Sequence, residues 1–146
     1  MKVQVVKFPP TPDEALQKVA ELRPLIDKAF TESIGGNTSA LANEMIVIMW
    51  HSAMLDFIEV LASDKRVGLL MTNIYHNDFT GKRIAQIVRG YVEPEYRRQG
   101  YFKKMLEHAR LVYQARSVDY IDMVIEDNQV PITFGNKIAS VFRLEL

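Results

Sequence analysis

The chain has 146 residues, 48% of them hydrophobic and 25% charged, which is typical of one folded domain over residues 1–146. Its 18 Lys and Arg residues balance 18 Asp and Glu residues, so no overall charge favours nucleic acid or an anionic membrane as a partner. Cysteine is absent, which excludes disulfides, thiolate nucleophiles and cysteine-based zinc sites.

The N-terminal part of the chain predicts one strand followed by a long helix. Alternating valines indicate a strand within residues 3–8. Thr11 and Glu14 have the spacing of a capping box, so we expect the helix to begin there and to end at the glycine pair 35–36. We expect Pro24 to kink or divide this helix, because proline lacks the N–H donor and clashes with the preceding turn.

A second helix is predicted to begin near residue 38 or 39. Its run 45–50 is apolar on every side, so periodicity alone does not distinguish a buried helix from a buried strand. This run is far shorter than the ~20 residues of a membrane span, and the first ten residues lack the apolar core of a signal peptide. We therefore expect a cytoplasmic protein without a membrane partner. The expected apolar side of this helix consists of Leu41, Met45, Ile48 and Ser52.

Three β-like segments, at 57–62, 67–75 and 83–92, follow with turn signals between them, and they predict an antiparallel meander. After Gly100 comes an amphipathic helix, and then a strand at 118–125. Because a helix crosses over between them, this strand is expected to be parallel to 83–92. The fold class is therefore α/β with a mixed sheet.

The junction between the strand that ends at Val92 and the next helix carries the clearest functional signal. The first turn of a helix presents N–H groups that have no partner within the helix, at the positive end of the helix dipole. Arg97 and Arg98 add full charges beside this point. Such a junction predicts an anion site, and a phosphorylated ligand is the natural occupant.

The residues of this junction also resemble a known family. The run Val92-x-Pro94-x-Tyr96-Arg97-Arg98-Gln99-Gly100-Tyr101-Phe102 resembles the pyrophosphate loop and third helix of the GNAT superfamily of N-acetyltransferases. The family signature is Arg or Gln, two residues, Gly, one residue, then Gly or Ala, so Phe102 departs from it. The order of elements is similar over nearly the whole chain, and the size is similar to that of short phage-type acetyltransferase-like proteins.

The resemblance implies acetyl-CoA, or another acyl-CoA, as co-substrate. It places the pyrophosphate on the N–H groups of residues 98–102 and the pantetheine arm along the strand that ends at Val92. Splaying of the neighbouring strand would leave free edge groups for the pantetheine amides. The implied cofactor-binding residues are Tyr91, Val92, Arg97, Arg98, Gln99, Gly100, Tyr101, Phe102 and Asn128.

Catalytic residues are harder to assign. The positions most used for the general base in the family hold Gln86 and Val88, neither of which accepts a proton, and the position of the usual tyrosine acid falls on Gly135. The weak candidates that remain are Glu93, acting through water, together with Tyr75 and Gln86.

Two functions follow from this resemblance. The first is an N-acetyltransferase that transfers acetyl by direct attack of an unknown small-molecule or protein amine. The alternative is a catalytically impaired acyl-CoA-binding or protein-interaction module. The fold would be that of the GNAT family without its last strand, and the edge left by that strand suggests a homodimer. No metal, nucleic-acid or membrane partner is expected.

Overall fold

The computed structural model describes residues 1–32 and 41–123, in which five strands form one sheet in the order β1-β2-β3-β4-β5. The elements in chain order are β1 (Lys2–Val5), α1 (Pro12–Thr31), α2 (Asn43–His51), β2 (Leu55–Ala62), β3 (Lys65–Asn77), β4 (Lys82–Val92), the 3-10 helix η1 (Pro94–Tyr96), α3 (Tyr101–Ala115) and β5 (Tyr120–Met123). Among these described elements, no helix is both long and apolar enough to cross a membrane.

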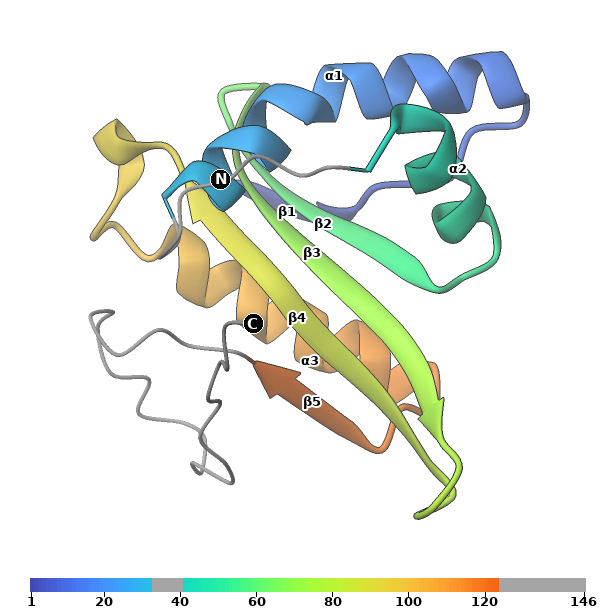
Figure 1. Cartoon of the computed structure of the whole chain (residues 1–146). Coiled ribbons are helices and arrows are strands. Elements are labelled where there is room, and N and C mark those ends of the chain that lie inside the picture. The colour runs from blue at the N-terminus through green and yellow to red at the C-terminus, as the bar shows by residue number, and fades with distance from the viewer. Residues whose placement is uncertain (33–40, 124–146) are drawn as a thin grey trace, which may run out of the picture.

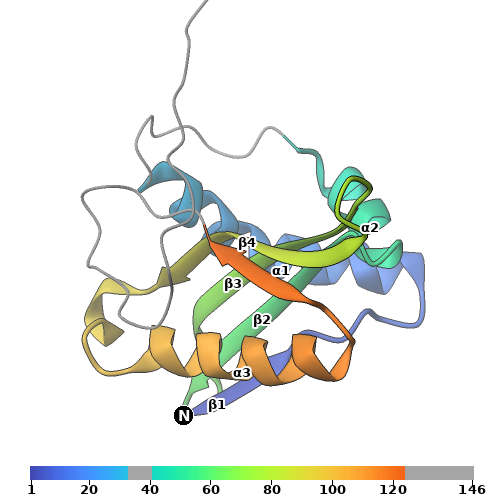
Figure 2. The same ribbon diagram turned by 90° about the horizontal axis from the view of Figure 1, so that it is seen from below.

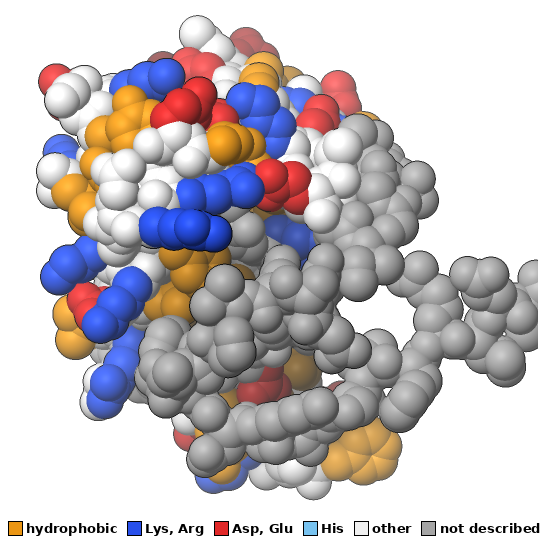
Figure 3. Space-filling view, turned by 90° about the vertical axis from the view of Figure 1, so that its left-hand side faces the viewer, with side chains coloured by type: hydrophobic (Ala, Val, Ile, Leu, Met, Phe, Trp, Pro, Cys, Tyr) orange, Lys and Arg blue, Asp and Glu red, His pale blue; other side chains and the backbone are white. Residues whose placement is uncertain are grey.

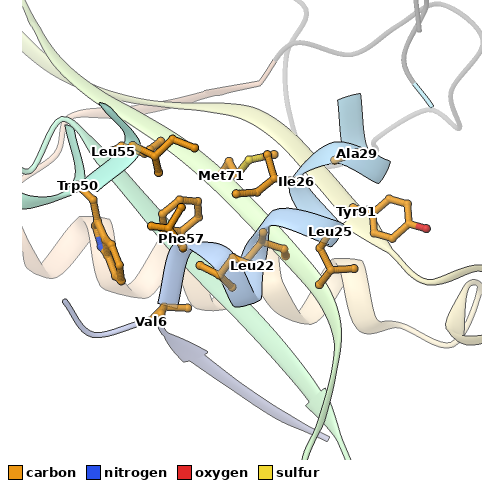
Figure 4. Packing of buried hydrophobic residues seen from close by; sticks show 13 residues of the cluster. Val6, Leu22, Leu25, Ile26, Ala29, Trp50, Leu55, Phe57, Met71 and Tyr91 are labelled. Carbon is orange, nitrogen blue, oxygen red and sulfur yellow. The ribbon is translucent and has the colours of Figure 1, made fainter. Parts of the chain in front are cut away.

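The sheet is covered on both faces, with α1 and α2 on one side and α3 on the other (Figures 1 and 2). On the α1/α2 face, Leu22 and Ile26 pack with Trp50, Phe57 and other buried side chains of the sheet (Figure 4). A second cluster on the α3 face joins residues of the strands to the apolar side of α3. Its α3 members include Met105, Leu106, Ala109 and Tyr113. Burial of two sheet faces explains why β2 and β3 are apolar at successive positions and do not alternate.

The predicted start of α1 is confirmed, because the Thr11 side chain accepts a hydrogen bond from the Glu14 N–H at 3.2 Å. Pro24 does not divide the helix, which runs unbroken from Pro12 to Thr31. The ribbon changes direction in its second half (Figure 1). Burial of residues on both sides of the proline, including Leu22 and Ile26, holds the two halves of α1 on the sheet.

The predictions for α2 are partly wrong. The helix begins at Asn43, and its buried residues are Ile46 and Trp50, whereas Met45 and Ile48 on the expected apolar side are 46% and 58% exposed. Trp50 decides the orientation, because its ring packs edge-on against Phe57 with centroids 5.4 Å apart. Because the helix is apolar all round, its hydrophobic periodicity does not determine which side is buried, and contact with the sheet does.

The predicted meander is confirmed. Ser63 and Asp64 have positive φ angles of 48° and 64°, as a two-residue type I′ hairpin turn requires, and β2 pairs with β3 from that turn. β3 and β4 form the second hairpin, and β5 is parallel to β4 as predicted. Asn128 and Gly135 lie outside the described residues, as does the end of the strand predicted at 118–125.

Candidate functional site

The chain turns sharply between the end of β4 and the start of α3. Gly100 precedes α3 with a φ of 86°, and the N–H of Lys104 donates to the Gly100 carbonyl at 3.0 Å. Within the described part of the chain, no oxygen accepts a hydrogen bond from the backbone N–H groups of residues 98–103. We call these six groups the loop amides. They remain available at the positive end of the α3 dipole.

Among the described residues, the space beside Gly100 is open. A Cβ atom added to Gly100 would meet none of their atoms within 4 Å. Arg98, Lys103 and Lys104 are exposed around this point, and Lys and Arg side chains gather on this face of the molecule (Figure 3). Unpaired amides, open space and flanking cations together fit a phosphate-bearing ligand.

The two arginines of the loop differ in their contacts. Arg97 donates from Nε to the Val92 carbonyl at 2.8 Å and from Nη2 to Glu32 Oε1 at 2.5 Å, and its guanidinium lies over the Tyr91 ring. Arg97 therefore holds the loop to the C-terminal end of α1, and Glu32 offsets its charge. Arg98 is exposed and has no partner within the described residues, so its charge is free for a ligand.

Glu93 is also engaged with α1. Its Oε1 accepts from Lys28 Nζ at 2.8 Å, and its Oε2 accepts from the Tyr91 hydroxyl at 3.3 Å. Burial raises the pKa of Tyr91, and the negative charge of Glu93 raises this pKa further. The carboxylate of Glu93, a candidate base in the sequence analysis, is thus held in an ion pair with Lys28 that joins α1 to the loop.

Phe102, which departs from the family signature, packs against a glycine of β4. The partly buried Phe102 ring packs against the core on the α3 face. A Cβ atom on Gly90 would lie 2.4 Å from Phe102 Cε2 and 2.8 Å from Leu70 Cδ2. The bulky residue is therefore accommodated on the sheet side of α3, away from the space at Gly100. Gly90 supplies the room that the ring needs.

Gly90→Ala is expected to lower the free energy of unfolding by about 2 kcal/mol, because the new methyl group overpacks against the Phe102 ring. In a Phe102→Ala background the same change should cost less, about 1 kcal/mol, because only the close contact of the new Cβ with Leu70 Cδ2 remains. Urea denaturation of the four proteins gives this double-mutant cycle. An equal cost of Gly90→Ala in both backgrounds would show that the ring does not set the constraint.

β4 contains a bulge next to the region where the family places the thioester. Met71 of β3 pairs with Arg89, and the next residue, Thr72, pairs with Ile87, so Val88 is an extra residue. Within the described residues β5 pairs with β4 only as far as Ile87. Val88 to Val92 lie beyond the last described pair of β4 and β5, along the stretch where the resemblance expects the pantetheine arm.

An apolar cavity of about 120 Å³ lies beside this bulge, between α1, α2 and the sheet. We call it the apolar cavity. Among the side chains that line it are Phe30, Met49, Phe57, Met71, Asn73 and Val88, and none of its lining residues is charged. The sequence did not predict the cavity, because its walls come from five elements and from Leu41, two residues before α2.

The remaining predicted site residues are spread along the sheet and loop. Tyr75 is 42% exposed near the far end of β3 and pairs with Ile84, well away from the loop amides. Val92 is buried in the α3-face core. In the loop, Gln99 donates from Nε2 to the Glu95 carbonyl at 3.0 Å. Tyr101 packs edge-on against the Tyr96 ring.

Gln86 lies in the middle of the sheet, with Asn73 beside it on β3 and Asp122 beside it on β5. The sequence did not predict the position of Asp122 beside Gln86, because the register between parallel strands depends on a crossover of more than twenty residues. Within the described residues, no three His, Asp or Glu side chains are close enough to hold a metal ion.

Comparison with known proteins decides the family. A model of the acetyltransferase (GNAT) family matches residues 21–133, which is most of the chain. This protein belongs to the GNAT acetyltransferase family. The matched region of this GNAT protein includes the loop amides, the β4 bulge and the walls of the apolar cavity. A search of curated proteins finds no match.

Solved structures share the fold of this GNAT protein at low sequence identity. An aminoglycoside acetyltransferase from an uncultured soil metagenomic sample, in complex with sisomicin, is 17% identical, with a TM-score of 0.70 over 99% of this chain and 96% of that one. A Trypanosoma brucei acetyltransferase is 15% identical, with a TM-score of 0.67 over 99% of each chain. A ribosomal-protein-alanine N-acetyltransferase from Brucella melitensis is 11% identical, with a TM-score of 0.63 over 97% of this chain and 100% of that one.

Proposed function

We propose that the protein is an acetyl-CoA-dependent N-acetyltransferase that acts on an amine. The observation that carries this proposal is the set of loop amides, which face open space at Gly100 with no protein acceptor in the described part of the chain. A diphosphate would accept hydrogen bonds from these amides at the positive end of the α3 dipole, with the exposed Arg98 guanidinium beside it. Family membership supports acetyl-CoA as the ligand that supplies the diphosphate.

The geometry of β4 supports a binding path for the pantetheine arm and the thioester of the co-substrate. With the diphosphate at the loop amides, the pantetheine arm would extend back along β4 toward Val88, beyond the last described pair with β5. Glu93 lies five positions after Val88, a distance of about 16 Å at the rise of a strand. The thioester would then lie beside the bulge and the apolar cavity, and Glu93 would lie too far away to serve as its base.

The transfer requires an unprotonated amine next to the thioester. The nitrogen lone pair forms a bond to the acetyl carbon, and the carbon–sulfur bond breaks with its electron pair passing to sulfur. Backbone N–H groups of β4 beyond its last described pair with β5 are suited to stabilise the charge that develops on the carbonyl oxygen. Holding the amine and the thioester together at the apolar cavity supplies much of the rate enhancement.

A second candidate function is supported by the residues at the usual base positions. Gln86 and Val88 occupy them, and neither accepts a proton. A GNAT fold with these residues could bind acetyl-CoA without transferring acetyl and act as a binding module. The two candidates differ in turnover and agree in cofactor binding.

Calorimetry with acetyl-CoA, CoA and ATP, followed by a thiol-release assay on a panel of amines, separates these outcomes. Acetyl-CoA binding with thiol release that depends on an amine would support the transferase. Binding without release from any amine would support the binding module. Absence of acetyl-CoA binding would overturn both proposals.

A further inference from the structure

Three polar residues form a row across the centre of the sheet. Asn73 of β3 pairs with Gln86 of β4, and Gln86 pairs with Asp122 of β5. Directly paired residues of neighbouring strands project to the same face of a sheet, so all three side chains share one face. We call these three residues the polar row.

The polar row projects to the α1/α2 face. Asn73 lines the apolar cavity together with Phe30 of α1 and Met49 of α2. Met123, which follows Asp122, instead packs with the core on the α3 face, as the alternation of a strand requires. Asp122 is partly buried, and it supplies the carboxylate of the polar row.

Charge around the cavity is distributed unevenly. The lining residues are uncharged, and beyond the bulge the Arg89 guanidinium lies over the Phe30 ring with its Nη1 donating to the Val88 carbonyl. Asp122 is not one of the lining residues and lies two strands from Asn73 in the polar row, so an ammonium group held between the cavity and Asp122 would be repelled by Arg89 and attracted by Asp122. The walls between them suit an apolar group and exclude a second charge, because an unpaired charge is costly to bury.

We propose that the acceptor is a primary amine with an apolar substituent that enters the apolar cavity, and that Asp122 receives the amine nitrogen and takes its proton. This inference rests on the proposed transferase function and adds to it the class of acceptor and the missing proton acceptor. The family resemblance implies a base on β4, whereas the strand register places the carboxylate of Asp122 on β5, beside β4.

The proton balance of the transfer is then complete. The ammonium gives one proton to Asp122 as the amine nitrogen approaches the thioester. The neutral nitrogen forms its bond to the acetyl carbon, and the electron pair of the broken carbon–sulfur bond passes to sulfur. The second nitrogen proton goes to the thiolate, so CoA leaves as a thiol, and Asp122 returns its proton to water.

The test uses 2-phenylethylamine as the apolar amine and ethanolamine as a small polar amine. With the wild-type protein, 2-phenylethylamine should be acetylated at least tenfold more efficiently. Asp122→Asn should lower kcat/KM for 2-phenylethylamine by roughly 100-fold, the range expected for loss of a general base. The dissociation constant of acetyl-CoA, measured by calorimetry, should stay within twofold of the wild-type value.

Asp119→Asn is the matched control, because it removes the same charge three residues earlier. Asp119 Oδ2 accepts from the Arg83 N–H at 2.9 Å, and an asparagine oxygen can accept the same bond. Its kcat/KM should stay within twofold of wild type. Binding of 2-phenylethylamine to the CoA-loaded protein should weaken at least tenfold in Asp122→Asn, while binding of the uncharged 2-phenylethanol should not change.

The inference is overturned if Asp122→Asn retains both amine binding and turnover within threefold, or if ethanolamine serves as well as 2-phenylethylamine. Acetyl-CoA binding without any binding of 2-phenylethylamine would also overturn it and would leave the proposed function standing. Failure of acetyl-CoA to bind would instead refute the proposed function, and the amine-binding measurements on the protein alone would still decide for or against the acceptor site.

Discussion

Gly100→Asp is expected to weaken acetyl-CoA binding by roughly 100-fold, because the new carboxylate would enter the open space before the loop amides and repel the diphosphate. The substitution should not unfold the protein. A Cβ at this position meets no atom of residues 1–32 and 41–123 within 4 Å, and aspartate tolerates a positive φ better than most residues. Isothermal calorimetry with acetyl-CoA measures the effect, and urea denaturation measures the cost to the fold, which should be about 1 kcal/mol.

Gly81→Asp provides the matched control for this experiment. Gly81 has a φ of 70°, and a Cβ there also meets nothing within 4 Å, but it lies in the turn between β3 and β4 at the opposite end of β4 from the loop amides. It should show the same loss of stability and unchanged acetyl-CoA binding. Equal binding losses in both variants, or none in Gly100→Asp, would contradict a diphosphate site at Gly100.

Asp56→Ala is expected to lower the free energy of unfolding by about 3 kcal/mol, as is typical when one partner of a buried charged network is removed. Asp56 Oδ2 accepts from Arg116 Nη1 at 2.7 Å and from the Tyr113 hydroxyl at 3.3 Å, while Oδ1 accepts from the Phe57 N–H at 3.0 Å. The variant leaves the fully buried Tyr113 hydroxyl without this acceptor. The bonds to Tyr113 and Arg116 join the end of α3 to the start of β2, so their loss weakens the attachment of α3 to the sheet.

Glu107→Ala is the corresponding control on the solvent side of α3. Glu107 pairs with Lys104 at 3.5 Å, and both side chains are more than half exposed. Its loss should change stability by at most about 0.5 kcal/mol. Urea denaturation with equal m-values gives both numbers, and a cost below about 1 kcal/mol for Asp56→Ala would show that the network is not a major source of stability.

The α3 junction was predictable because its signals are local. A glycine before an amphipathic helix, two arginines and a preceding strand all lie within residues 84–116, and the structure places Gly100 at the start of α3 with unpaired amides around it. The different contacts of Arg97 and Arg98 were not predictable. Their side chains are identical, and only the approach of α1, which brings Glu32 to Arg97, distinguishes them.

The side of α2 that faces the sheet could not be predicted from the sequence. Every side of the run 45–50 is apolar, so its pattern contains no preference. The choice is made by rings that are distant in the chain, since Trp50 packs against Phe8 and Phe57. The apolar cavity arises in the same way, from side chains that several elements bring together.

By itself the sequence determined the order of the strands and helices, the antiparallel meander and the strand–turn–helix junction at Gly100, because each depends on residues close together in the chain. Tertiary structure alone decided which groups meet at the centre of the sheet. The position of Asp122 beside Gln86 depends on the register of β4 and β5. The chain between these two strands forms α3, and the packing of α3 on the face of the sheet sets that register. Contacts between distant segments are fixed by how whole elements pack, and no local pattern contains that information.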